Sequence, residues 1–472
     1  MHAQTFAPAP AADAPRATAA LTPAPFAPLR RAALGLGLAL GLGAALLAPA
    51  AQAETEVQVI TSPGGITAWL VEEHAIPMVA MEFIFDTGAR LDPMDQQGAT
   101  NFLSTMLDEG AGDLDSAAFS ARAETLALRV GFDAGRDSFT VNARMLTENL
   151  GPSAELLRLA LVEPRFDAEP LERMRAGILS GLRSEKTDPD AIAAEAWRDA
   201  VYGPGSVHGR PMKGTEADVE AITADTLRAA RARAFNRSGV AVGVVGDIDA
   251  ETLGPLLDRI LGDLPDAPLP APELEMVETD GALQVVEFDT PQAVARLVGP
   301  GILRDDPDFM AAYVMNHVLG GGGFASRLME EVREKRGLTY GVWSYLAAGQ
   351  TTGLVVAGVS SDNAKVAEAV EVIKAEWARM AAEGPTAEEL EAAKQYLTGA
   401  YPLRFDSNGK IAGQLAGLMH QGFTPDYIRD RNAMIEAVTL EDAKAAAARL
   451  LDAGKLHVTV VGKPEGLGDA VN

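Results

Sequence analysis

Apolar and polar positions along the chain form strand-like and helix-like segments, and the same order of segments occurs twice. In the first half, the apolar run at 77–85 predicts a strand, and 98–108 predicts a helix after a turn-rich segment. In the second half, 293–298 predicts a strand and 307–319 predicts a helix. This repetition indicates two halves built on one plan.

Each half also ends on a similar apolar segment. Residues 240–247 read VAVGVVGD, and residues 456–463 read LHVTVVGK. Between the halves lies the segment LPDAPLPAP, in which alternating prolines exclude a helix or a central strand and favour an extended linker. We therefore expect an N-terminal domain at 54–264, a proline-rich linker at 265–280 and a C-terminal domain at 281–472.

The predicted helix at 98–108 has one apolar and one polar face. Its apolar positions have the spacing of a helix that packs on a sheet, and they are Ala99, Phe102, Leu103, Met106 and Leu107. The opposite face carries Asn101, Ser104 and Thr105.

Composition narrows the classes of function. With 472 residues, 47% of them hydrophobic and 22% charged, the chain is long and apolar enough for two or three packed domains. Cysteine is absent from the sequence, which excludes disulfides, thiolate zinc sites and cysteine nucleophiles. The formal net charge of −26 would repel nucleic acid, so we expect no nucleic-acid partner.

Residues 1–53 have the pattern of a secretion signal. Arg30 and Arg31 precede an apolar run of Gly, Ala and Leu, which is followed by the small-residue triplet Ala51-Gln52-Ala53. We expect cleavage after Ala53 and a periplasmic or secreted product; the alternative is an uncleaved tether. Because no later run is apolar enough to cross a bilayer, we expect no stable membrane span after cleavage.

Several blocks spread over the chain after residue 53 resemble the insulinase-like, or inverzincin, metallopeptidases, which include a bacterial and mitochondrial-processing branch. The blocks are FIFDTGAR at 83–90, GATNFLSTM at 98–106, RPMKGT at 210–215, GGGGFASRL at 320–328 and REKRGLTY at 333–340. The resemblance implies an α+β fold of two homologous domains, each a mainly antiparallel sheet packed with helices.

The family's catalytic zinc is bound by H-x-x-E-H on a helix, in which the two histidines are ligands and the glutamate activates water. By resemblance these places are held here by Asn101, Ser104 and Thr105, and the third ligand, a glutamate in the family, falls on Gly181. An amide and a hydroxyl do not replace two imidazoles, and a serine lacks the basicity to deprotonate water. We therefore expect no metal and no cofactor in this chain.

The second half retains a different family feature, an Arg and a Tyr seven residues apart that grip the peptide beside the metal. Arg333 and Tyr340 match it. We expect Arg333 in the last turn of a helix that Gly337 closes with a left-handed cap, and Tyr340 at the start of the next strand. In the alternative interpretation, Arg333 pairs with Glu330 and Tyr340 is half-buried in a sheet.

These observations predict a zinc-less subunit that is inactive alone and completes the site of a zinc-bearing homologous partner, with short or unfolded polypeptides as substrates. The first alternative is a purely structural or peptide-holding protein without a catalytic role. The second is a self-contained enzyme with an unrecognised site. The glycine run at 320–323 lacks the Lys-Ser/Thr of a phosphate-binding loop, so it indicates a flexible loop.

Overall fold

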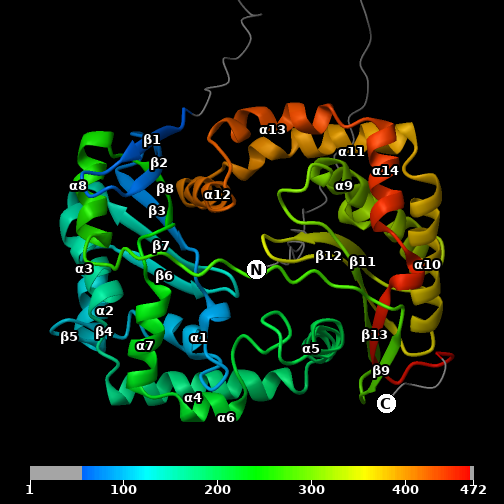
Figure 1. Ribbon diagram of the computed structural model, residues 1–472, viewed down its shortest axis with the longest axis horizontal. Coiled ribbons are helices and arrows are strands. Elements are labelled where there is room, and N and C mark those ends of the chain that lie inside the picture. The colour runs from blue at the N-terminus through cyan, green and yellow to red at the C-terminus, as the bar shows by residue number, and fades with distance from the viewer. Residues whose placement is uncertain (1–55, 468–472) are drawn as a thin grey trace, which may run out of the picture. The chain divides into compact units, whose positions relative to one another are not determined.

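The computed structural model describes residues 56–467 (Figure 1). The predicted secretion signal at 1–53 lies outside these residues. In the described part, none of the helices combines the length and the apolar character needed to cross a membrane.

The two halves form two sheets with the same strand order. The second sheet runs β9-β13-β10-β12-β11, which repeats the order β2-β8-β3-β7-β6 of the first sheet; β1 adds an edge strand to the first. Neighbouring strands are antiparallel except for one pair at the matching place in each sheet, β2 with β8 and β9 with β13. The predicted α+β fold with mainly antiparallel sheets is confirmed.

The strands of the first sheet are β1 (Gln58–Thr61), β2 (Thr67–Glu72), β3 (Met78–Phe85), β6 (Arg129–Ala134), β7 (Phe139–Leu146) and β8 (Ala241–Gly246). Those of the second are β9 (Leu283–Glu287), β10 (Gln292–Pro300), β11 (Val342–Ala348), β12 (Gly353–Asp362) and β13 (His457–Gly462). A two-stranded ribbon joins β4 (Gly110–Ala111) to β5 (Leu114–Asp115). The strands predicted at 77–85 and 293–298 are β3 and β10.

The helices of the first half are α1 (Ala99–Ser104), α2 (Ser116–Thr125), α3 (Leu150–Val162), α4 (Ala168–Glu185), α5 (Pro189–Tyr202), α6 (Glu216–Ala221), α7 (Ala224–Ala234) and α8 (Ala250–Leu261). Those of the second are α9 (Phe309–Asn316), α10 (Val366–Glu383), α11 (Ala387–Gly399), α12 (Asn408–His420), α13 (Asp426–Glu436) and α14 (Leu440–Leu450). The helix predicted at 98–108 is shorter than expected, because the chain turns after Ser104. The helix predicted at 307–319 continues beyond α9 as a π-helical turn, His317–Gly321.

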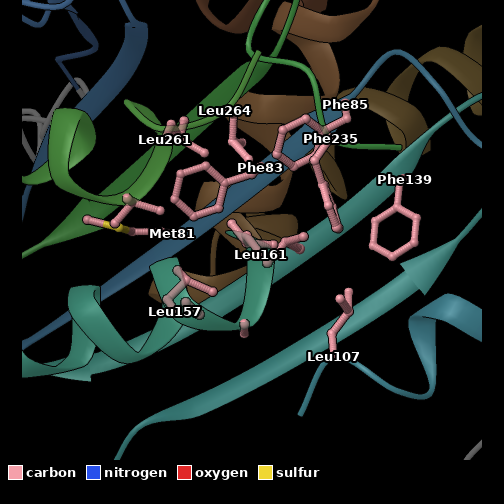
Figure 2. Packing of buried hydrophobic residues seen from close by; sticks show 14 of the residues in the cluster. Met81, Phe83, Phe85, Leu107, Phe139, Leu157, Leu161, Phe235, Leu261 and Leu264 are labelled. Atoms are coloured by element: carbon pink, nitrogen blue, oxygen red, sulfur yellow. The ribbon is translucent and has the colours of Figure 1, made fainter. Parts of the chain in front are cut away.

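One face of each sheet packs on helices of its own half. In the first half, Phe83 and Phe85 of β3 point into a core that also contains Leu157 and Leu161 of α3 (Figure 2). Phe235 meets both Phe85 and Phe139 edge-to-face, with ring centroids about 5 Å apart. The matching face of the second sheet packs on α9, α10 and α14.

The other face of each sheet is covered by a helix from the opposite half. Helix α12 packs on β3 and β8, and α5 packs on β10 and β13. Gly243 permits the first contact, since a Cβ there would lie 2.2 Å from the Ala412 backbone oxygen. Ala193 of α5 is fully buried against Val294 and Val461 of the second sheet. Strands β8 and β13 are buried along their whole length because both of their faces are covered.

The predicted linker lies in a segment without helix or strand, between the end of α8 at Leu261 and the start of β9 at Leu283. Asn236 fixes its start by donating to the Ala267 backbone oxygen at 2.7 Å. Further along, the Glu275 backbone nitrogen donates to the Thr351 backbone oxygen at 2.8 Å.

Candidate functional site

The polar face of α1 is where the family resemblance places a zinc site. Gly98 starts the helix in a left-handed conformation, with φ of 81°. Asp92 fixes its first turn by accepting hydrogen bonds from the Thr100 backbone nitrogen at 3.0 Å and the Thr100 hydroxyl at 2.6 Å. Burial raises the pKa of Asp92, and these hydrogen bonds oppose that shift.

The hydroxyls on this face are used within α1. The Ser104 Oγ donates to the Asn101 backbone oxygen at 2.7 Å, and the Thr105 Oγ1 donates to the Phe102 backbone oxygen at 2.8 Å. Such bonds satisfy the backbone carbonyls at the end of a short helix. Both hydroxyl protons are therefore used within α1, and neither hydroxyl is basic enough to deprotonate water at neutral pH.

The third predicted position also provides no ligand. Gly181 lies on α4, which contacts α1, and a Cβ added at Gly181 would meet only open space. Arg175 of the same helix places its guanidinium 5.6 Å from the centre of the Phe102 ring. Among residues 56–467, no three His, Asp or Glu side chains gather closely enough to hold a metal ion. The donors present at these positions therefore do not fit zinc.

Arg333 lies in the second half, in a π-helical turn over Met329–Glu334. Gly337 closes the turn with φ of 61°, and its backbone nitrogen donates to the Arg333 backbone oxygen at 2.8 Å. The left-handed cap is therefore present. The Arg333 guanidinium lies 4.7 Å from the centre of the Phe324 ring, and its Nη1 donates to Glu334 at 2.6 Å. The ion pair of Arg333 is thus with Glu334 rather than with Glu330.

Tyr340 precedes the strand instead of beginning it. Strand β11 starts at Val342, and Tyr340 occupies a bend in which its side chain is 88% exposed. The bend is held by Thr339, whose hydroxyl donates to the Ser360 backbone oxygen at 2.6 Å. Within the described part of the chain, no residue forms a hydrogen bond with the Tyr340 hydroxyl. Its side chain is neither half-buried nor part of the sheet.

The glycine run before Arg333 packs against β11. A Cβ at Gly320 would lie 2.6 Å from the Ser344 backbone nitrogen, so the close approach requires glycine. Asn316 and Ser344 fix this contact through a 2.8 Å hydrogen bond between their side chains. The run ends in Phe324, which is 70% exposed and stacks on Arg333. Sequence reasoning missed this contact, although an aromatic residue directly after a glycine run was its signal.

The structure thus brings Arg333 and Phe324 together and leaves Tyr340 free on the same half. In residues 56–467, no hydrogen bond or ion pair connects Arg333 or Tyr340 with the polar face of α1.

Comparison with known proteins identifies the family to which this fold belongs. The family model described as insulinase, peptidase family M16, matches residues 69–207, and the model described as the peptidase M16 inactive domain matches residues 221–397. The chain belongs to the insulinase family. This membership confirms the resemblance in the sequence.

Curated relatives of the insulinase-family chain include proteins with different printed descriptions. The non-peptidase homolog YmxG of Helicobacter pylori is 27% identical over 340 residues, which cover 71% of this chain and 77% of that protein. An uncharacterized zinc protease of Streptomyces coelicolor is 25% identical over 406 residues, covering 84% of this chain and 87% of that protein.

Solved structures share the insulinase-family fold. A peptidase M16 inactive domain from Pseudomonas fluorescens superimposes with a TM-score of 0.81 at 28% identity, covering 88% of this chain and 100% of that one. A protease from Helicobacter pylori has the same fold, with a TM-score of 0.78 at 16% identity over 86% of this chain and 99% of that one. The motif H-x-x-E-H does not occur in the sequence, so the chain is a degenerate, peptidase-like member of the insulinase family.

Proposed function

We propose that this chain is the non-zinc-binding subunit of a heteromeric peptidase, which supplies Arg333 and Tyr340 to a site completed by a zinc-bearing homologous partner. Its substrates are short or unfolded polypeptides. Alone, it hydrolyses no peptide bond. Family membership and the absence of the zinc motif support the first part of this proposal.

The exposure of Tyr340 is the observation that carries the proposal. A tyrosine kept for packing buries its ring and pairs its hydroxyl, whereas Tyr340 is 88% exposed beside an edge strand. Its bend is nevertheless well defined by the Thr339 hydrogen bonds. A fixed backbone that presents a free phenol suits contact with another molecule.

The chemistry of the two side chains suits a peptide. Arg333 uses Nη1 on Glu334 and one face on Phe324, which leaves its other donors for a peptide carbonyl. The free Tyr340 hydroxyl can donate to the oxyanion that develops when a peptide carbonyl is attacked. The two residues would therefore position the substrate and stabilise charge on it, while water activation belongs to the partner.

A periplasmic location is part of the proposal and is supported by the sequence of residues 1–53 alone.

Purification from the native host tests the proposal. We expect a homologous chain with an H-x-x-E-H motif to copurify, and peptide hydrolysis to require both chains when each is prepared separately and mixed. If the partner alone hydrolyses the same peptides as fast as the mixture of both chains does, the proposal is wrong.

A second function is favoured by partly exposed aromatic rings of the second half, at Phe324 and along strand β11. Phe324 is 70% exposed, and Trp343 stacks on Tyr345 along β11 with ring centroids 5.2 Å apart. These rings suit a protein that holds peptides without taking part in catalysis. Peptide binding by this chain, combined with partner activity that does not change when the chain is added, would favour this function.

A further inference from the structure

A cavity of about 290 Å³ lies in the second half, away from the proposed peptide site. It is formed where α9, α12 and α13 meet the short 3-10 turn Tyr401–Arg404. Three arginines line it, Arg304, Arg404 and Arg431, together with three tyrosines, and no Asp or Glu of the described residues is part of the lining. Neither Arg333 nor Tyr340 lines this cavity.

Arg431 is the most buried of these cations, with 5% of its surface exposed. Its Nη1 donates to the Leu397 backbone oxygen at 2.9 Å, and its guanidinium lies 4.3 Å from the centre of the Tyr401 ring. Within residues 56–467 it forms no ion pair with a carboxylate. A buried guanidinium without an anion is electrostatically costly, so the position favours an incoming negative charge.

Arg304 is held by aromatic rings. Its guanidinium lies 3.8 Å from the centre of the Phe309 ring and 4.6 Å from that of Phe423, and its Nη2 donates to the Tyr427 hydroxyl at 2.9 Å. These contacts fix the position of the cation without neutralising it. Arg404 lines the cavity as well, is exposed, and has no ion-pair partner in the described chain.

The lining also contains an unpaired buried hydroxyl. Tyr401 is 7% exposed, and its hydroxyl has no hydrogen-bond partner among the described residues. Buried polar groups are normally paired, so an orphaned one at a cavity wall indicates a missing partner. Burial raises the pKa of Tyr401, which keeps the phenol protonated and able to donate.

The basic lining of this cavity contrasts with the acidic excess of the whole sequence. The sequence has 66 acidic against 40 basic residues, and many arginines pair with carboxylates, as Arg327 does with Glu389. Other arginines, such as Arg210, instead donate to backbone carbonyls. A cavity with three arginines and no acid is therefore a local concentration of positive potential.

We propose that this cavity binds a small organic anion in which a carboxylate or a phosphate is attached to an apolar or aromatic body. The guanidiniums match the oxygens of either head group, and the Tyr401 hydroxyl supplies one further donor. The rings of Phe309, Tyr313 and Tyr427 provide a surface for the body. The volume is at the lower end of small-molecule sites. This site is independent of the proposed peptidase role.

Calorimetric titration of the purified chain tests the site with four probes: inorganic phosphate, phenyl phosphate, N-acetylphenylalanine and the uncharged N-acetylphenylalanine amide. We expect phenyl phosphate or N-acetylphenylalanine to bind more tightly than the amide and than inorganic phosphate. The tighter of the two identifies the head group. If neither anion binds more tightly than both the amide and inorganic phosphate, the proposal is wrong.

Two variants keep the test independent of folding defects. Arg404→Gln should weaken binding of the better anion about tenfold, while Arg122→Gln, a change of the same charge on the exposed part of α2, should not. Tyr401→Phe should also weaken binding, about threefold to tenfold, without lowering the unfolding temperature, since no protein hydrogen bond is lost. Equal affinities for Arg404→Gln and Arg122→Gln would overturn the proposal.

Discussion

The two halves share one strand order but carry their polar side chains at different places in it. After β3, the first half forms α1, and the hydroxyls of Ser104 and Thr105 donate to carbonyls of that same helix. After β10 and α9, the second half leaves Tyr340 in solvent and places Arg333 on the exposed ring of Phe324. In the first half these two hydroxyls bond within their own helix after β3, whereas in the second half the exposed residue precedes β11, the strand that matches β6. The shared strand order therefore does not depend on which polar side chains each half exposes.

The two sheets also differ in the charged residues on the face that a helix of the other half covers. In the first sheet, Gly243 pairs with Glu82 on the face that α12 covers. In the second, Thr459 pairs with Arg296, whose guanidinium forms an ion pair with Asp190 of α5. The first sheet therefore carries a half-buried acid that forms no ion pair among the described residues, although the charge of Arg144 acts on it. The second sheet pairs its charge with the incoming helix.

The largest effect is expected at Tyr340, the exposed tyrosine before β11. Tyr340→Phe in the assembled complex should lower turnover by about 10² to 10³, because an oxyanion donor is lost while the ring remains. Turnover of a fluorogenic peptide measures this. Tyr396→Phe removes the same atom from another exposed tyrosine of the second half and should leave turnover unchanged. Equal rates for Tyr340→Phe and the unmodified complex would remove the proposed role of Tyr340.

The next effect concerns the close approach of α12. Gly243→Ala should lower the free energy of unfolding by about 3 kcal/mol, since the added Cβ would lie 2.2 Å from the Ala412 backbone oxygen, where no flexible side chain can yield. Denaturant titration measures the change. Gly177→Ala, on α4 with no atom within 4 Å of the new Cβ, should instead raise stability by about 0.5–1 kcal/mol. A Gly243→Ala protein as stable as the unmodified one would show that α12 does not pack as described.

The next expected effect is smaller and depends on pH. Titration of Glu82 should make the stability of the protein depend on pH, whereas the charge of Arg296 should not. Burial raises the pKa of Glu82 from 4.5 to about 7. The Glu82 carboxyl therefore loses its proton at lower pH in the unfolded chain than in the folded one. As pH rises from about 4.5 to about 7, this difference lowers the stability of the folded protein. Glu82→Gln should therefore match the unmodified protein at pH 4.5 and be more stable by about 2 kcal/mol at pH 8.

Arg296→Gln is the control at the matching place. It removes an ion pair whose Asp190 partner is largely exposed, so it should cost about 0.5–1 kcal/mol with little change between pH 6 and pH 8. A Glu82→Gln advantage that does not depend on pH would indicate a packing effect instead of a titration.

The smallest expected effect is no effect. The double variant Asn101→His and Thr105→His should give neither tight zinc binding nor peptide hydrolysis, because Ser104 supplies no base and Gly181 no third ligand. Elemental analysis after dialysis, together with a peptide assay, measures both. Robust hydrolysis by this variant would show that the positions were assigned incorrectly.

Much of the fold could be predicted from the sequence because the apolar patterns are local. The similar segments at 240–247 and 456–463 became β8 and β13, at matching places in the two sheets. The packing of α5 and α12, each on the sheet of the other half, could not be predicted. Periodicity shows that a helix has an apolar face but not which sheet that face covers. The signal available was the continuously apolar character of β8 and β13, which is typical of strands covered on both faces.

Local errors at the candidate site have similar causes. The apolar stripe continues to Leu107, but the chain turns after Ser104. The helix was predicted too long because a periodic pattern does not show where backbone hydrogen bonding stops. Tyr340 was expected to begin a strand, but it lies in the bend before Val342. The cavity lined by Arg304, Arg404 and Arg431 joins residues up to 127 positions apart, and no spacing in the sequence indicates it.

In the proposed function, the catalytic site is shared between two chains. The most direct test is an assay of the purified chain alone on an unfolded polypeptide, with and without a zinc chelator, and again after addition of its copurifying homologue. We expect no hydrolysis by the lone chain and chelator-sensitive hydrolysis by the pair. Chelator-sensitive hydrolysis by the lone chain would contradict the proposed function.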